Sequence, residues 1–279
     1  MIPNRLLSVV CLFGAGTWAL PTPAEGTDTT TATATATATS TLTSLTTTAT
    51  PYNFTDGAVT TFPIHASCNS TLRRQLERGL DETVQLAAHA RDHILRWGHD
   101  SPFVQKYFGG MDGNGSSSTA TPLGWYSRIV AGDRGNMTFR CDDPDENCAT
   151  QDGWAGHWRG SNATEETVIC APSYAKRRYL DSVCGLGYTV AESALNTFWA
   201  TDLLHRVLHV PRISEGVVEH FADEGYDGVV ALARTDPAKS GMDSDTLQYF
   251  AIDVYAHDVA APGVGCTTTN TGTTAGEGK

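Results

Sequence analysis

Two histidines four residues apart, His205 and His209, are the residues of this chain best placed to do chemistry. On a helix, this spacing puts both imidazoles on one face, about one turn apart. The zinc-binding H-E-x-x-H helix has the same geometry. Most neighbouring residues are apolar, which predicts a buried helix; they are Trp199, Leu203, Leu204, Val207 and Leu208. A buried imidazole needs a polar partner, so the pair indicates either a shared zinc ion or two hydrogen-bonded core histidines.

A zinc site built on this pair needs a third protein ligand, and the segment after Pro211 contains the candidates. His220 is favoured because it is the next histidine along the chain. Glu215 comes second, because it lies six residues after His209, the offset of the third ligand in H-E-x-x-H-x-x-G-x-x-H. The glycine of that motif is missing here. The weaker candidates are Glu219 and Asp223, and any of the four could instead be an ordinary surface residue.

The residue between the two histidines argues against catalysis. In H-E-x-x-H enzymes, the glutamate after the first histidine takes a proton from the metal-bound water. Arg206 occupies that position here. An arginine stays protonated and cannot act as a base. We therefore expect a protein that binds zinc, and assign no catalytic residue.

The remaining histidines give weaker signals. His89 and His93 share the four-residue spacing, but we expect them on the half-exposed flank of a helix. His257 follows Asp253 by four residues, which is typical of a helical surface pair. Residues 215–258 contain ten acidic residues and two basic ones. That excess is either a solvated face or a negative field that concentrates cations.

The composition and charge of the chain limit the class of protein that it can be. The chain has 279 residues, 40% of them apolar, and a net charge of -12. A general nucleic-acid binder needs a basic surface, so that class is excluded. Residues 1–19 resemble a secretory signal peptide, and no other stretch approaches a membrane span of about 20 apolar residues. Residues 20–51 read as a disordered Thr/Ala-rich stalk, since 14 of the 24 residues in 27–50 are threonine. The folded domain is predicted at 52–266, followed by a disordered tail at 267–279.

Six cysteines follow the signal segment, which itself contains Cys11. An even number in a secreted chain predicts three disulfides, although connectivity cannot be deduced from sequence. Short separations favour two local pairs, Cys141–Cys148 and Cys170–Cys184. Cys68 and Cys266 then form the third. Cysteine ligation of zinc is less favoured because the chain has no C-x-x-C pair. Five glycosylation sequons begin at Asn53, Asn69, Asn114, Asn136 and Asn162.

Hydrophobic periodicity predicts an α+β domain with a small sheet. Four helices are expected, at 70–97, 193–210, 217–234 and 244–260. Three short strands are expected between the first two helices, at 125–130, 137–141 and 167–170. The histidine pair lies on the second of these helices.

Several segments together resemble the fungal HRxxH family. They are Phe198–Pro211, which contains the H-R-x-x-H sequence, Glu219–Asp223, Leu247–Tyr255 and Pro262–Cys266. Thr167–Tyr174 is also similar to the strand that precedes the zinc helix in deuterolysin-type peptidases. The resemblance spans about 60–266. His205 and His209 match the two histidines of the family motif.

The resemblance implies a secreted, zincin-like protein that captures zinc outside the cell, in the medium or at the cell wall. Members of the family include a pH-regulated surface antigen that scavenges zinc as a zincophore, and a major secreted mould allergen. Partners implied by the family are the zinc ion and a cell-surface zinc transporter or host proteins. The tail lacks the Cys/His-rich extension of some relatives, which puts transporter docking in doubt. An active zinc peptidase and a cell-wall adhesin are the two alternatives.

Overall fold

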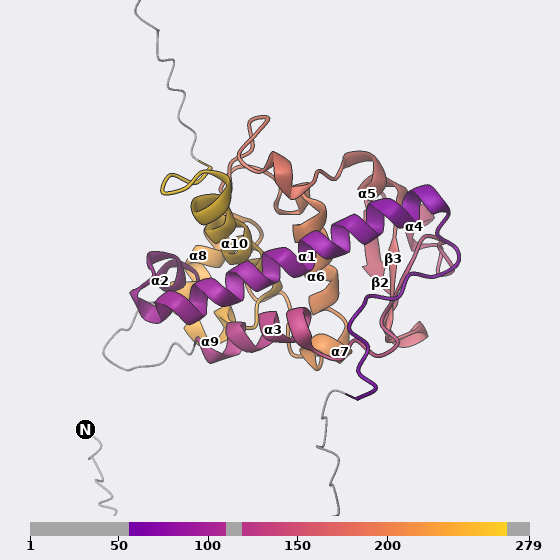
Figure 1. Cartoon of the computed structure of the whole chain (residues 1–279), viewed down its shortest axis with the longest axis horizontal. Helices are drawn as coiled ribbons and strands as arrows, with labels where there is room; N and C mark the ends of the chain where they lie inside the picture. The colour runs from indigo at the N-terminus through magenta and orange to yellow at the C-terminus, as the bar shows by residue number, and fades with distance from the viewer. Residues whose placement is uncertain (1–55, 110–118, 267–279) are drawn as a thin grey trace, which may run out of the picture. The chain divides into compact units, whose positions relative to one another are not determined.

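A computed structural model describes residues 56–109 and 119–266 of the chain (Figure 1). The described residues fall within the range predicted for the folded domain. The predicted signal peptide, stalk and tail lie outside them, as do the sequons at Asn53 and Asn114. No helix in 56–109 or 119–266 is long and apolar enough to cross a membrane.

The longest helix, α1, spans Ser70–Trp97 and confirms the first predicted helix. Asn69 caps its start by accepting hydrogen bonds from the backbone N–H groups of Thr71 and Leu72. Gly98 ends it with φ 49°, a conformation that suits glycine. Its buried face includes Leu76, Leu80, Leu86, Ala87, Ala90 and Ile94, and this stripe organises the core.

Three helices pack directly against α1: α3 (Ala120–Ala131), α6 (Trp199–Leu208) and α10 (Ser244–Tyr255). In Figure 1, α3 runs beside α1, whereas α6 crosses it. Helix α6 approaches α1 closely at Gly79, where a Cβ atom would lie 3.0 Å from Leu203 Cδ1. The other helices are α2 (Pro102–Phe108), α4 (Asn147–Thr150), α5 (Ala171–Lys176), α7 (Pro211–Ser214), α8 (Tyr226–Thr235) and α9 (Pro237–Ser240). Helix α6 is therefore a central element of the core.

A three-stranded sheet lies near one end of α1 (Figure 1). Its strands are β1 (Thr138–Arg140), β2 (Gly156–Trp158) and β3 (Glu166–Ile169), in the order β1-β3-β2. The central strand β3 pairs parallel with β1 and antiparallel with β2. The α+β class with a small sheet is confirmed, and so are the strands predicted at 137–141 and 167–170.

Three expected elements differ from the structure. The strand predicted at 125–130 is part of α3, because Tyr126 and Ile129 bury one face at helical spacing. Helix α6 begins at Trp199, six residues later than predicted. The helix predicted at 217–234 begins only at Tyr226, because Glu219 instead forms a bridge with Asp243. The last predicted helix, 244–260, is confirmed as α10 followed by a π-helical turn, Ala256–Ala260.

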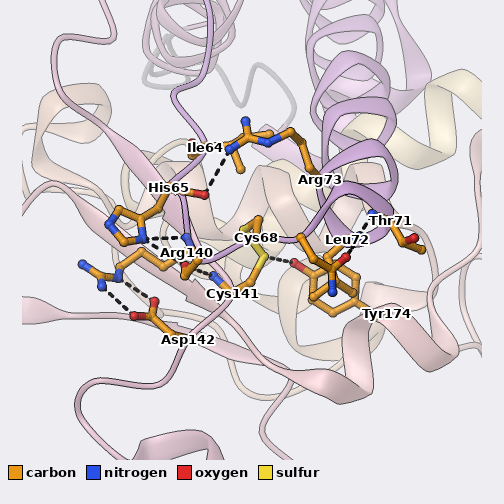
Figure 2. Close-up of a disulfide and its surroundings, with 12 residues drawn as sticks. Ile64, His65, Cys68, Thr71, Leu72, Arg73, Arg140, Cys141, Asp142 and Tyr174 are labelled. Carbon is orange, nitrogen blue, oxygen red and sulfur yellow. Dashed lines mark hydrogen bonds and ion pairs between the residues drawn. A yellow bond between two sulfur atoms is a disulfide. The ribbon is translucent and has the colours of Figure 1, made fainter.

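The prediction of three disulfides is confirmed, but the predicted pairing is wrong. The observed pairs are Cys68–Cys141, Cys148–Cys170 and Cys184–Cys266. The reason is the sheet, which brings distant segments together. Ile64 bridges to Phe139 in β1 and so places Cys68 beside Cys141 (Figure 2). Cys170 follows β3 directly and meets Cys148 in α4.

We predict that Leu203→Ala lowers the free energy of unfolding by about 2–5 kcal/mol, because it opens a cavity between α6 and α1. Leu203 is fully buried, whereas Leu95 on α1 is 64% exposed. Leu95→Ala is the matched control and should change the free energy by no more than about 0.5 kcal/mol. Chemical denaturation measures both. Equal effects of the two substitutions would contradict this packing.

Candidate metal site

Three histidines converge at the end of α6. His205 lies in its last turn, His209 follows directly as the C-cap residue, and His220 comes from the segment between α7 and α8. Their ring centroids are 4.5 to 5.0 Å apart. One nitrogen from each ring lies within 4.8 Å of the other two. The structure thus brings together the predicted histidine pair and His220, the favoured third ligand.

Local chain geometry places each of these histidines. The α6 helix stops at His209 because Pro211 starts the separate helix α7. The segment that carries His220 is held against the start of α10, where Ser244 N–H donates to the Glu219 carbonyl over 2.9 Å. Asp243 adds to this attachment, because its carboxylate accepts hydrogen bonds from the backbone N–H groups that follow His220.

Glu215, the other predicted ligand, does not join the cluster. It adopts a left-handed conformation, with φ 56°, at the end of α7. Its carboxylate instead forms an ion pair with Arg128 on α3. The six-residue offset from His209 does not give a shared site because α7 intervenes and no glycine turn directs the chain back.

Gln248 on α10 fixes the orientation of His205. The Gln248 side-chain amide donates to the Thr201 carbonyl over 2.7 Å. Its oxygen Oε1 therefore faces His205 Nδ1, 3.1 Å away, and accepts that N–H. This leaves the lone pair of His205 Nε2 available for a metal ion. Metal-binding histidines typically make such a hydrogen bond through the ring nitrogen that does not bind the metal. No sequence spacing connects position 248 with 205, so sequence reasoning missed this residue.

Asp245 is the second residue that the sequence did not single out. Its Oδ1 lies 3.5 Å from His220 Nδ1 and 3.7 Å from His205 Nδ1. Its hydrogen bond raises the pKa of His220, against the opposing effect of burial. Burial, with the charges of His209 and Arg206, lowers the pKa of His205 to about 3. Burial also lowers the pKa of His209. Two of the three imidazoles are therefore held neutral.

The donor set fits zinc. Zinc binds imidazole nitrogens at about 2.0–2.1 Å in tetrahedral geometry, which separates two ligand nitrogens by roughly 3.3 Å. His209 Nε2 and His220 Nε2 are 3.1 Å apart. Neutral imidazoles are the form that coordinates a metal. Three nitrogen ligands would leave one position open for water or a further ligand.

Arg206 forms a buried ion pair and cannot act as a general base. The residue is 7% exposed, and its guanidinium donates to Asp202 Oδ1 over 2.9 Å. Asp202 also contacts Arg177, at 3.3 Å. Because Asp202 is fully engaged, it is not available to accept a proton from water. The Arg206–Asp202 pair thus lies within α6, and it is Asp202 that links this helix to Arg177 at the end of α5.

The histidine cluster opens into a cavity of about 800 Å³, lined by His205, His220 and Arg206 among other residues. Glu224 and Asp245 also line it. Glu215 and Glu219, two of the candidate zinc ligands from the sequence, are not among its lining residues. The cavity thus provides access to the metal site without placing either of those glutamates in it.

The second histidine pair belongs to a separate cluster. His89 Nε2 and His93 Nδ1 both bond to Asp258, at 3.1 and 2.8 Å, and His257 bonds to the other oxygen of that carboxylate. His93 is buried rather than half-exposed as expected, because α10 and the π-helical turn cover that face of α1. These histidines are satisfied by hydrogen bonds and lie outside the candidate site.

Comparison with known proteins identifies the family of the chain. A family model described as "HRXXH: Putative peptidase family" matches residues 20–269. The chain is 57% identical to "Major allergen Asp f 2" of Aspergillus fumigatus, over 77% of this chain and 67% of the relative. It is 46% identical to "pH-regulated antigen PRA1" of Candida albicans (78% and 70%) and 34% identical to "Protein ZPS1" of Saccharomyces cerevisiae (73% and 79%).

Among solved structures, the chain is similar to a zinc peptidase from Grifola frondosa. The TM-score is 0.47 and the sequence identity 18%, over 66% of this chain and 96% of the other.

We predict that His220 and His205 of the metal-free protein titrate far apart in an NMR pH titration. His220 should protonate above the usual midpoint of about 6.5, because Asp245 raises its pKa. His205 should stay neutral well below that pH, because it is buried. Asp245→Asn should lower the His220 midpoint. A single shared midpoint for the two histidines would contradict the geometry of the site.

Proposed function

The chain belongs to the HRXXH family, and on that premise we propose that it is an extracellular zinc-binding protein. His205, His209 and His220 hold the ion. The single observation that carries the proposal is the convergence of three imidazoles within 4.8 Å of one another. Zinc capture, rather than zinc-dependent hydrolysis, is the function that this site supports best.

Each residue around the ion has a role in holding it. His205 and His209 are fixed by α6, and Gln248 directs the free nitrogen of His205 toward the site. His220 closes the site from the opposite segment, and Asp245 beside it offsets part of the positive charge of the ion. The surrounding burial excludes protons from two of the imidazoles at neutral pH.

The absence of peptidase activity follows from Arg206. The position that carries the general base in H-E-x-x-H peptidases holds a cation here. That cation is paired with Asp202. We therefore expect the zinc-loaded protein to leave peptides intact, even though its family is described as peptidase-like.

The extracellular part of the proposal rests on two observations. The three disulfides are consistent with an oxidising compartment. Two relatives bear the names of an allergen and an antigen. Secretion through the segment at 1–19, with the stalk at 20–51 and tail at 267–279, completes the proposal. N-terminal sequencing of the secreted protein would test it.

Ligand substitutions test the metal site. His205→Ala/His209→Ala should abolish specific zinc binding, because only one imidazole remains. His220→Ala should weaken zinc affinity by at least about tenfold, whereas Glu215→Ala should leave it unchanged because Glu215 faces Arg128. Competition with a chromogenic chelator measures these affinities.

His89→Ala/His257→Ala is the matched control for the double substitution, since both histidines lie in the Asp258 cluster. It should retain full zinc affinity at the main site. Full affinity in the His205→Ala/His209→Ala protein would refute the proposed function. Peptide cleavage that a chelator abolishes and zinc restores would refute the absence of peptidase activity.

Zinc affinity should fall as pH drops. The raised pKa of His220 means that this ligand gains its proton first, while His205 and His209 stay neutral because their pKa values are lowered. Below the His220 pKa, the zinc Kd should rise about tenfold per pH unit, since one proton is displaced for each ion bound. Asp245→Asn should move this fall to lower pH. A pH-independent Kd between about pH 5 and 7 would contradict it.

A further inference from the structure

We propose that Cys148, Cys170 and His157 form a second zinc site when the disulfide between the two cysteines is reduced. The two sulfur atoms and one His157 ring nitrogen lie within 4.8 Å of one another. Two thiolates and one imidazole are ligands typical of zinc. In the oxidised protein the sulfurs are bonded to each other, so this site depends on redox state, and it shares no ligand with the three-histidine site.

His157 is the observation that points to a ligand here. Its side chain is 6% exposed, and within the described residues neither ring nitrogen has a hydrogen-bond partner. The nearest carboxylate oxygen, Asp145 Oδ2, is 3.6 Å from Nε2, which is longer than a hydrogen bond. That carboxylate is already paired with Arg159. A buried imidazole without a partner is costly, and a metal ion would satisfy it.

The framework of the site does not depend on the disulfide. His157 lies in β2 opposite Val168 of β3, so the strand pairing holds it in place. Cys170 continues from β3, and its N–H donates to the Ala155 carbonyl over 2.9 Å. Ser173 donates to the same carbonyl. Two of the three ligands therefore stay close together when the sulfur–sulfur bond is broken.

Comparison with the Cys68–Cys141 disulfide shows why the proposed zinc site is specific to Cys148 and Cys170 (Figure 2). A histidine, His65, lies nearby there too, but its Nδ1 is hydrogen-bonded to Ser67 Oγ at 2.9 Å. The Tyr174 hydroxyl donates to Cys141 Sγ. Across 56–109 and 119–266, no cluster of metal-ligating atoms includes this pair.

The chemistry balances with a dithiol as reductant. The dithiol gives two electrons to the sulfur–sulfur bond, becomes a disulfide itself, and leaves two cysteine thiols. Zinc binding then displaces one proton from each thiol, while His157 donates a neutral lone pair. Reoxidation by a disulfide of the same class reforms the bond between the cysteines and releases the ion. The protein would thus hold one more zinc ion under reducing conditions than under oxidising ones.

Cobalt titration of the full chain, reduced with a phosphine, tests the site. Cobalt–thiolate complexes absorb in the near ultraviolet through charge transfer, whereas a site with imidazole ligands alone does not. The reduced wild-type protein should develop this band with about one ion per chain, and the oxidised protein should lack it. His157→Gln should weaken cobalt binding at least about tenfold. His65→Gln, the matched control beside the other disulfide, should bind like wild type.

If reduction unfolds the protein, as judged by the loss of its circular dichroism spectrum, a second measurement applies. During oxidative refolding, zinc should slow closure of Cys148–Cys170 in wild type and His65→Gln, but not in His157→Gln. Alkylation and mass spectrometry follow closure of each disulfide. A folded, reduced protein without the thiolate band would overturn the proposal. Equal behaviour of the two histidine variants, in cobalt binding or in closure rate, would also overturn it.

Discussion

The burial of α6 between α1 and α10 is the interaction on which the candidate site depends. Its apolar residues, Trp199, Leu203 and Leu204 among them, are completely buried. Because the helix cannot shift without opening the core, its two histidines are held at a fixed spacing. The same burial disfavours the charged form of His205. Packing therefore both positions His205 and His209 and disfavours their charged forms.

Helix α10 connects this core with His220, the third ligand of the proposed site. Its Gln248 bonds to His205, and its first turn anchors the segment that carries His220. Asp243 stabilises that turn as an N-cap and binds the backbone after His220 as well. The first two turns of α10 thus both contact His205 and hold the segment that carries His220 beside it.

Much of this site could be predicted from the sequence, because local spacing determines it. The four-residue spacing and apolar flanks identified His205 and His209, and His220 was favoured over Glu215 because it is the next histidine along the chain. Gln248 and Asp245 were missed because tertiary packing alone brings them to the histidines. The disulfide pairs were mispredicted for the same reason, since strand pairing joins Cys68 to Cys141 across 73 residues. The strand predicted at 125–130 failed because β-favouring residues such as Tyr126 and Ile129 lie at helical spacing on α3.

Arg206 occupies the position of the general base in H-E-x-x-H peptidases and is paired with Asp202 within α6, so the proposed function rests on metal binding alone. The central claim is therefore the location of the ion, and an anomalous difference map at the zinc edge, from crystals of the zinc-loaded oxidised protein, tests it most directly. We expect one strong peak at about 2.0–2.1 Å from a ring nitrogen of each of His205, His209 and His220. A peak bound by other residues, or no peak at this cluster, would contradict it.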